Sequence, residues 1–379
     1  MLNRLGNMST VCRQTNNSAI YGILKNHLCL NIKTYYPDIS PGEIVIRGNK
    51  KPKLNKLSFQ FYFEIISKGN NFEKRGLVIK IPRYFNTREI SVAISDQTLK
   101  RQAKKEFQAL CQLFNYFYSL NNDVLGAVRP IDYIDHINGI VTERVFGKSL
   151  DREVNRASVR FQSDRFHKNY LYKYMEYCGK WLRLLHHMPW HEEVDHFDLK
   201  QDLQVINNIL SRLAQYNIKR NLLEFINGFV CDEFYKIFSL LEEQDIVLLH
   251  QDFQTRNIFL TNGKIVPFDT LLDKKGIRYR DIGKFICSLR ITKVRFLFDR
   301  TLFDHAVIKE LENRFLLGYF GDKDFSRTLL NWYLLWAILQ KWNQFHKIAR
   351  FQGKLVPCKM ISKLWINRIF EEEISRIVG

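Results

Sequence analysis

The chain has 379 residues, a length that predicts two or three lobes. Of these residues 46% are hydrophobic and 26% charged, which is typical of a soluble globular protein. Lys and Arg outnumber Asp and Glu by 58 to 39, and the net charge of +19 favours anionic partners such as nucleotides, nucleic acid, acidic glycans or a membrane surface. The seven cysteines are scattered, which argues against a disulfide framework and favours a reducing cytoplasm. The N-terminus shows no apolar signal segment, and the longest apolar run, at 329–339, is too short to span a bilayer.

The first third of the chain predicts an antiparallel sheet. Residues 1–41 are polar and Asn-rich, with one expected helix at 18–29. Strands are expected at 44–46, 58–65 and 77–81, and the second alternates apolar with polar residues, the period of a half-buried strand. Together these strands predict an antiparallel meander.

Lys80 lies inside the third strand, within the apolar run Leu-Val-Ile-Lys-Ile-Pro. A lysine there needs a partner or a ligand, unless the strand lies at an edge and the lysine faces solvent. A helix at 98–120 follows, and Glu106 is its only acid, so Glu106 is the expected ion-pair partner unless it is an ordinary exposed glutamate. Glu106 flanks the predicted apolar stripe of this helix, which consists of Ala103, Phe107, Leu110, Phe114 and Phe117.

Two more strands are expected at 127–133 and 139–145, and the chain reads as mostly helical from residue 151 onward. A helix through Leu171 and Leu182 is expected to stop before Pro189. Further helices are predicted at 201–214, at 222–241 and in the tail after 303.

The stretch 248–270, LLHQDFQTRNIFLTNGKIVPFDT, contains the clearest chemical pattern. Asp252 stands five residues before Asn257, and a strand hairpin then ends in Asp269. Magnesium prefers hard oxygen ligands, and a hydroxyl nucleophile needs a nearby carboxylate. The spacing therefore suits phosphoryl transfer from ATP, with an ordinary hairpin carrying solvated acids as the alternative.

A second polar segment suggests a metal site less clearly. Its spacings match no common zinc pattern, so a metal is not the preferred interpretation. The residues concerned are His186, His187, His191, Glu192, His196 and Asp198.

The order of these features resembles that of the aminoglycoside phosphotransferase and choline-kinase-like family, over roughly residues 43 to 290. The motif reads His250-Gln251-Asp252, then Asn257, then Phe268-Asp269-Thr270. Two positions depart from related patterns. Gln251 stands where the family often has Gly, and Thr270 stands where protein kinases have Phe-Gly.

The resemblance implies an α+β, bilobal protein-kinase-like fold. A small antiparallel-sheet N-lobe with one main helix is expected at 43–147 and binds the nucleotide. A larger, mainly helical C-lobe at 148–379 carries the catalytic and acceptor-binding groups. Residues 1–42 form an N-terminal extension.

The resemblance also implies the roles of individual residues in the N-lobe. Lys80, held by Glu106, orients the α- and β-phosphates of ATP. The backbone of Glu143, Arg144 and Val145 forms the hinge that binds the adenine edge. The segment 47–56 has one glycine and five basic residues, and either covers phosphates or is a solvated basic turn.

In the C-lobe, the resemblance makes Asp252 the catalytic base and Asn257 with Asp269 the Mg²⁺ ligands. The helix ending in Leu185-His186 is expected to pack its histidine behind the catalytic loop. Asp281 is expected to be a helix N-cap that hydrogen-bonds the backbone of that loop, as structural support and not as a metal ligand.

The acceptor is expected to be a hydroxyl of a small molecule, such as a sugar or an envelope glycan. The positive net charge makes a neutral or anionic acceptor a better expectation than a cationic aminoglycoside. The protein is expected in the cytoplasm. Peripheral contact with the inner face of the membrane is a second expectation. A catalytically silent kinase-like scaffold and a basic nucleic-acid-binding protein are the alternatives, although no nucleic-acid-binding motif is present.

Overall fold

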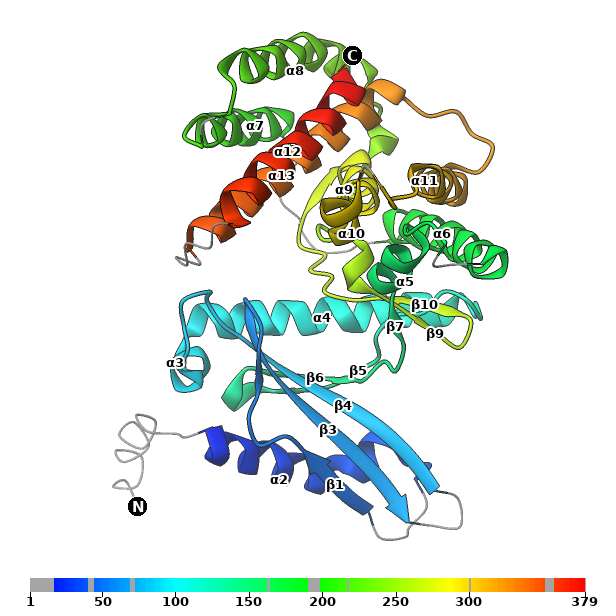
Figure 1. Cartoon of the computed structure of the whole chain (residues 1–379). Coiled ribbons are helices and arrows are strands. Elements are labelled where there is room, and N and C mark those ends of the chain that lie inside the picture. Colours follow the sequence, from blue (N-terminus) through cyan, green and yellow to red (C-terminus); the bar gives the residue numbers. More distant parts are fainter. Residues whose placement is uncertain are drawn as a thin grey trace. The chain divides into compact units, whose positions relative to one another are not determined.

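The computed structural model describes residues 17–39, 44–68, 72–161, 164–189, 198–216, 218–299, 301–351 and 358–378. Its helices and strands belong to two units (Figure 1). The first unit comprises Met1–Asn122 and Gly126–Phe146, and the second comprises Asp123–Leu125 and Gly147–Gly379.

The first unit contains an antiparallel six-stranded sheet in the order β1-β3-β4-β6-β5, with β2 paired to β3. The three predicted strands correspond to β1, β3 and β4, so the expected antiparallel meander is present. The strands are β1 (Ile44–Gly48), β2 (Lys53–Leu54), β3 (Ser58–Lys68), β4 (Phe72–Pro82), β5 (Pro130–Ile134) and β6 (Gly139–Glu143).

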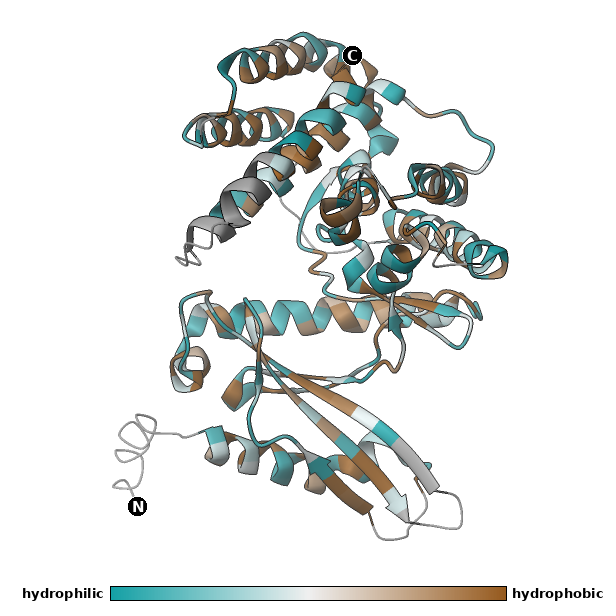
Figure 2. Ribbon diagram, viewed as in Figure 1, coloured by the Kyte–Doolittle hydropathy of each residue, from teal (hydrophilic) through white to brown (hydrophobic). Residues whose placement is uncertain are grey.

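One face of this sheet packs against α2 (Asn17–Tyr35), which is longer than the predicted helix at 18–29. The alternation of β3 points Phe59, Phe61 and Phe63 to this face, where all three are buried. The helix contributes every fourth residue to the same core, namely Ile20, Leu24, Leu28 and Ile32. The alternating brown and teal along β3 and β4 in Figure 2 follows this pattern.

The other face of the sheet is covered in part by α4 (Gln97–Ser119), which begins after the N-cap Asp96. The predicted apolar stripe of this helix is present, with Phe107 half-buried against Ala103 and Leu110, Phe114 half-buried, and Glu106 buried beside it. The helix turns Glu106 toward the sheet, where it pairs with Lys80. Its buried residues are Leu99, Ala103, Glu106, Ala109, Leu110, Leu113 and Phe117.

A buried arginine joins two loops at one end of the sheet. The Arg83 side chain is 6% exposed and donates hydrogen bonds to the carbonyl of Asn55 from Nε (2.9 Å) and Nη2 (2.6 Å). Its Nη1 donates to the carbonyls of Tyr84, Phe85 and Thr87. Burial and the nearby charge of Arg88 lower the pKa of Arg83. Four carbonyls from two loops thus converge on one guanidinium.

The basic segment at 47–56 is not a single turn. It ends β1, contains β2, and pairs Lys53 with Gln60 of β3. The turn into β3 is only Asn55 to Leu57, closed by a hydrogen bond from the Asn55 N–H to the Ser58 carbonyl (2.9 Å). The lysines of the segment are exposed.

The second unit is mainly helical. Its first helices are α5 (Leu150–Ala157), α6 (Arg165–His186), α7 (Leu199–Ala214) and α8 (Arg220–Leu240). Its later helices are α9 (Tyr279–Arg290), α10 (Lys293–Phe298), α11 (His305–Phe320), α12 (Arg327–Phe351) and α13 (Cys358–Val378). Short antiparallel strands pair as β10-β9-β7 and β11-β8. These strands are β7 (Lys148–Ser149), β8 (Ile246–Leu248), β9 (Ile258–Thr261), β10 (Lys264–Pro267) and β11 (Lys275–Ile277).

Two glycines allow α6 and α11 to pack backbone to backbone. A Cβ atom at Gly179 would lie 2.2 Å from the Phe315 carbonyl oxygen, and one at Gly318 would lie 2.1 Å from that of Glu176. The close approach brings Trp181 and Phe315 into an aromatic core with Phe253 and Phe285. This core lies directly behind the loop that follows β8.

The predicted fold class is confirmed, because a small antiparallel sheet with one long helix precedes a larger helical unit. The helix predicted in the extension, α2, belongs to the first unit, and the structure adds the short α3 (Ile90–Ser95) to that unit. Among the helices that are described, none is both long enough and apolar enough to cross a membrane.

We predict that Arg83→Leu lowers the free energy of unfolding by about 2 kcal/mol or more, because it removes every guanidinium donor from the carbonyls of two loops. Urea unfolding followed by circular dichroism measures the change. The exposed Arg88 is the matched control, and Arg88→Leu should stay within about 0.5 kcal/mol of the wild type. Equal losses in the two variants would show that Arg83 does not hold the loops.

Candidate active site

Asp252 and Asn257 lie together in the loop between β8 and β9. The Asn257 amide nitrogen donates to the Asp252 backbone carbonyl (2.9 Å) and to its carboxylate (2.7 Å). Because both amide hydrogens are used in this way, the Asn257 side-chain oxygen faces away from Asp252. The Asp252 side chain is 38% exposed, whereas Asn257 is buried. The loop therefore presents one oriented carboxylate on a rigid base.

Asp281 holds the backbone of this loop from behind. Its carboxylate accepts the N–H of His250 (2.6 Å) and the N–H of Gln251 (2.9 Å), as the sequence resemblance implied. Its predicted position as an N-cap is wrong, because α9 begins at Tyr279 after Arg278. Asp281 lies inside the first turn, and its oxygens bind the loop in place of the helix N–H groups.

His186 completes the support. Its Nε2 lies 3.3 Å from the Asp281 carboxylate and its Nδ1 lies 2.6 Å from the Tyr319 hydroxyl. Burial lowers the pKa of His186, although Asp281 opposes this shift. Burial alone would raise the pKa of Asp281, but the hydrogen bond from His186 and nearby positive charges lower it. The hydrogen bonds that Asp281 accepts at both oxygens therefore favour its ionised form.

The two departures from related sequence patterns both have a structural counterpart. Gln251 has φ of 69°, the left-handed region where glycine is favoured, and its side chain donates to the Asp273 carboxylate. Such a conformation costs a non-glycine residue about 1–2 kcal/mol. Thr270 is buried, and its hydroxyl lies 2.8 Å from His250 Nε2. Thr270 thus holds the ring of the motif histidine.

Asp269 stands at the end of the β9–β10 hairpin, where it is exposed and has φ of 60°. The preceding Phe268 donates its N–H to the Asn257 carbonyl (3.0 Å). This hydrogen bond links the backbone next to Asp269 with Asn257, so the second unit brings the two predicted metal ligands to one region.

Three polar residues beside Asp252 were not expected from the sequence. The Gln254 side chain donates to one carboxylate oxygen, and Arg256 Nη2 lies 3.2 Å from the other. Lys284 on α9 donates to the Gln251 carbonyl, and burial lowers its pKa. Arg256 lies within the motif itself, so its proximity to Asp252 was predictable in principle.

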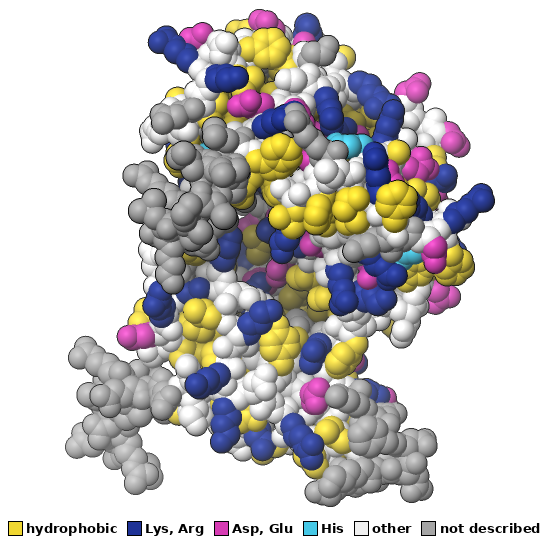
Figure 3. All heavy atoms as spheres, viewed as in Figure 1, with side chains coloured by type: hydrophobic (Ala, Val, Ile, Leu, Met, Phe, Trp, Pro, Cys, Tyr) yellow, Lys and Arg dark blue, Asp and Glu magenta, His cyan; other side chains and the backbone are white. Residues whose placement is uncertain are grey.

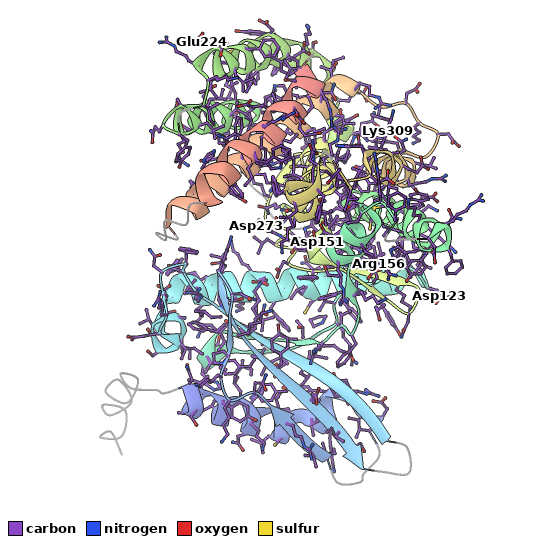
Figure 4. The ribbon with its side chains drawn as sticks, viewed as in Figure 1. Asp123, Asp151, Arg156, Glu224, Asp273 and Lys309 are labelled. Atoms are coloured by element: carbon purple, nitrogen blue, oxygen red, sulfur yellow. The ribbon has the colours of Figure 1, made fainter. Side chains whose placement is uncertain are left out.

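Acids also flank the loop in the second unit. Asp273 receives the Gln251 side chain, and Asp151 on α5 lies 3.3 Å from the Thr255 hydroxyl (Figure 4). The surroundings of Asp252 therefore carry charges of both signs.

The Lys80–Glu106 ion pair is present in the first unit, with 2.7 Å between Lys80 Nζ and Glu106 Oε1. The strand that carries Lys80 lies between β3 and β6, so the lysine is not on an edge strand. The Lys80 side chain is 22% exposed and that of Glu106 only 7%. Burying two charges is favourable only when they are well paired, and this geometry meets that condition.

The segment predicted as a hinge follows β6. The Glu143 N–H donates to the Arg129 carbonyl (2.9 Å), and the Arg144 N–H donates to the Gly76 carbonyl (2.8 Å). The Arg144 guanidinium lies over the rings of Tyr62 and Phe146. Within the part of the chain that is described, the Val145 N–H has no backbone acceptor.

The residues in the second unit fit a magnesium ion that is shared with phosphate groups. Mg²⁺ takes one or two protein oxygens and completes its shell with water and phosphate oxygens. Asn257 and Asp269 supply one amide oxygen and one carboxylate of this kind. Among the described residues, no group of three or more His, Cys, Asp or Glu side chains is arranged to hold a metal.

The alternative metal segment gains no support. His191, Glu192 and His196 lie outside the described residues. His186 is committed to Asp281 and Tyr319.

We predict that the second unit loses stability as the pH falls below about 6.5. Burial lowers the pKa of His186 and His250, so the unfolded chain takes up protons that the folded chain refuses. The loss should reach up to about 1.4 kcal/mol per pH unit for each histidine. Urea unfolding between about pH 7.5 and 5.5 measures this slope.

In His250→Gln the slope should be shallower, because one of the two protons is no longer taken up. The exposed His136 in the first unit provides the control, and His136→Gln should keep the slope of the wild type. An unchanged slope in His250→Gln would show that His250 does not titrate in this way.

Comparison with known proteins identifies solved structures that share the fold of this chain. None of the protein-family models matches the chain, and none of the curated proteins matches it. A choline/ethanolamine kinase family protein from Mesorhizobium loti superposes with a TM-score of 0.52 and 11% sequence identity, over 93% of this chain and 97% of that one. A glucosamine kinase in complex with glucosamine, ADP and inorganic phosphate gives a TM-score of 0.50 and 11% identity, over 92% and 97%.

An ADP-bound aminoglycoside phosphotransferase aligns over 92% of this chain and 98% of its own, with 14% identity and a TM-score of 0.47. The fold assignment is based on the first two structures, which have the higher TM-scores. The resemblance inferred from the motifs is confirmed at the level of the fold, and this chain has the protein-kinase-like fold of the choline-kinase-like small-molecule phosphotransferases.

Proposed function

We propose that the chain is an ATP-dependent phosphotransferase that moves the γ-phosphoryl group to a hydroxyl of a small molecule. The observation that carries this proposal is the arrangement around Asp252. Asn257 donates twice to Asp252, while Asp281 fixes the two peptide N–H groups before it. A loop held this rigidly around one partly exposed carboxylate suits a reaction whose rate depends on positioning.

Asp252 is the proposed catalytic base. In this role its carboxylate accepts the proton of the acceptor hydroxyl and orients the oxygen toward the phosphorus. Arg256 lies 3.2 Å from the same carboxylate. As a permanent cation, Arg256 would also favour the negative charge that spreads over the transferred group.

Asn257 and Asp269 are the proposed magnesium ligands. The ion would neutralise phosphate charge when it is bound. The Phe268 N–H bond to the Asn257 carbonyl supports this assignment, because it holds the hairpin end next to Asn257.

In the first unit, Lys80 is proposed to bind the α- and β-phosphates, with Glu106 holding its ammonium group. The Val145 N–H and the carbonyls of Glu143 and Arg144 are the proposed contacts for the adenine edge. We accordingly propose that residues 43–147 bind the nucleotide, that 148–379 carry the base and acceptor groups, and that 1–42 form an extension whose helix covers the sheet.

The proposed acceptor is a neutral or anionic sugar or glycan. A glucosamine kinase with the same fold makes a sugar a reasonable acceptor class. Arg256 beside the base favours an anionic or neutral group over a cationic one. Asp151 on α5 and Asp273 before β11 are also near the loop, but both are engaged by loop side chains.

A catalytically silent scaffold is the second candidate, since this fold supports binding without turnover. A shift in melting temperature with ATP and magnesium, without product from any acceptor, would favour it. A third candidate, a basic nucleic-acid-binding protein, would show a steeply salt-dependent gel shift with generic RNA or DNA.

We predict that ATP with Mg²⁺ raises the melting temperature of the wild type and that Asp269→Ala loses the magnesium-dependent part of this shift. The lost carboxylate is a proposed metal ligand, so ATP alone should behave alike in both proteins. The exposed Asp273 is a matched acid for comparison, and Asp273→Ala should keep the shift. A full shift in Asp269→Ala would remove it from the metal site.

We predict that Asp252→Asn lowers turnover by about 10²–10⁴-fold while nucleotide affinity stays within about threefold of the wild type. The amide keeps the shape of the side chain but is no longer a base. Coupled ADP release with a responsive acceptor measures turnover, and calorimetry measures affinity. Comparable turnover in the variant would exclude Asp252 as the base.

A further inference from the structure

Four large apolar side chains are exposed at one end of the sheet in the first unit. Leu54 at the end of β2 is 52% exposed, and Leu57 in the turn into β3 is 65% exposed. Tyr84 and Phe85 are 46% and 56% exposed in the loop after β4. Because β3 and β4 are antiparallel, the start of one adjoins the end of the other, and both loops lie at the same end of the sheet (Figure 1).

Hydrogen bonds from Arg83 connect the loop before β3 to the loop after β4. The Arg83 N–H donates to the Leu57 carbonyl (2.9 Å), and the Arg83 guanidinium joins the Asn55 carbonyl to those of Tyr84, Phe85 and Thr87. A buried cation therefore fixes the backbone from which the exposed apolar side chains project. We call Leu54, Leu57, Tyr84 and Phe85 the apolar platform.

The surroundings of the apolar platform are strongly basic. Residues 44–57 and 83–88 contain seven Lys or Arg residues, against two neighbouring acids, the exposed Glu89 next to Arg88 and Asp96, which accepts the Tyr84 hydroxyl (3.4 Å). Apart from Arg83, which is used internally, these cations are exposed. They are Arg47, Lys50, Lys51, Lys53, Lys56 and Arg88. Figure 3 shows Lys and Arg side chains among hydrophobic ones over this unit.

We propose that the apolar platform and its lysines bind the surface of an anionic lipid bilayer. Contiguous exposed apolar side chains mark interaction surfaces, and their fixed backbone lowers the entropic cost of binding. Apolar side chains enter the boundary between headgroups and acyl chains, while surrounding lysines meet the lipid phosphates. An acidic protein or a nucleic acid would pair with the cations, but it would bury the two leucines and the two aromatic side chains less well than a bilayer does.

The test of this inference is separate from the test of the phosphotransferase proposal. The residues concerned include the basic segment 47–56 but not the proposed base or metal ligands, and vesicle binding is measured without ATP. Failure of one proposal therefore leaves the other intact.

The test is co-sedimentation of the full-length protein with vesicles of phosphatidylcholine alone and with about a third phosphatidylglycerol. The wild type should bind the anionic vesicles at about 0.1 M salt and lose most binding at about 0.5 M, because screening weakens the contact with the lysines. Binding to neutral vesicles should be at least about tenfold weaker.

Two double variants separate the two parts of the surface. Leu57→Ser with Phe85→Ser removes apolar area and should weaken binding to anionic vesicles at least about tenfold. Lys50→Ser with Lys51→Ser should weaken it by roughly tenfold and flatten its salt dependence. Thermal unfolding by circular dichroism checks that each variant is folded.

Phe166 on α6 is the matched control, because it is 81% exposed but belongs to the second unit. Phe166→Ser should bind within about twofold of the wild type. Absence of binding to anionic vesicles, or equal binding by the Leu57→Ser, Phe85→Ser variant, would overturn the proposal. A gel shift with generic RNA that needs the lysines but not Leu57 and Phe85, without vesicle binding, would assign the surface to nucleic acid instead.

Discussion

The geometry of the candidate site depends on one buried carboxylate. Asp281 is inaccessible to solvent, yet both of its oxygens are occupied by the peptide N–H groups of His250 and Gln251 and by His186. An isolated buried charge is costly, but several hydrogen bonds to its ionised form offset that cost. The same bonds fix the loop that ends in Asp252. Gln251 accepts a left-handed conformation because its N–H and carbonyl are held on either side, by Asp281 and Lys284.

The residues that sequence reasoning placed correctly are those whose relation is local or is set by fold order. Asp252 and Asn257 are five residues apart, and one loop carries both. Lys80 and Glu106 are distant in sequence. Their pairing could still be predicted, because Lys80 is an isolated lysine on a buried strand and Glu106 is the single acid on the next helix. The resemblance to a known family also supplied the contact of Asp281 with the loop, which spacing alone does not give.

The misses have physical causes. The preference for Asp at the start of a helix predicted Asp281 as an N-cap. In the structure its carboxylate instead accepts the N–H groups of His250 and Gln251 in the loop. Apolar periodicity placed Glu106 beside the buried stripe of α4, yet it is itself buried, because periodicity does not register an ion pair that draws an acid inward. Nothing in the sequence distinguishes Arg83 from the many exposed arginines, since its burial results from carbonyls that two separate loops supply.

We propose that Lys80 binds the phosphates of ATP and that this binding requires Mg²⁺. Calorimetric titration of a non-hydrolysable ATP analogue into the wild type and Lys80→Met tests it most directly, with Lys100→Met as the control for loss of a lysine that pairs with an exposed acid, Asp135. We predict that the analogue binds only with Mg²⁺ and that its affinity falls at least about tenfold in Lys80→Met but not in the control. Equal affinity in the two variants, or no binding by the wild type, would contradict it.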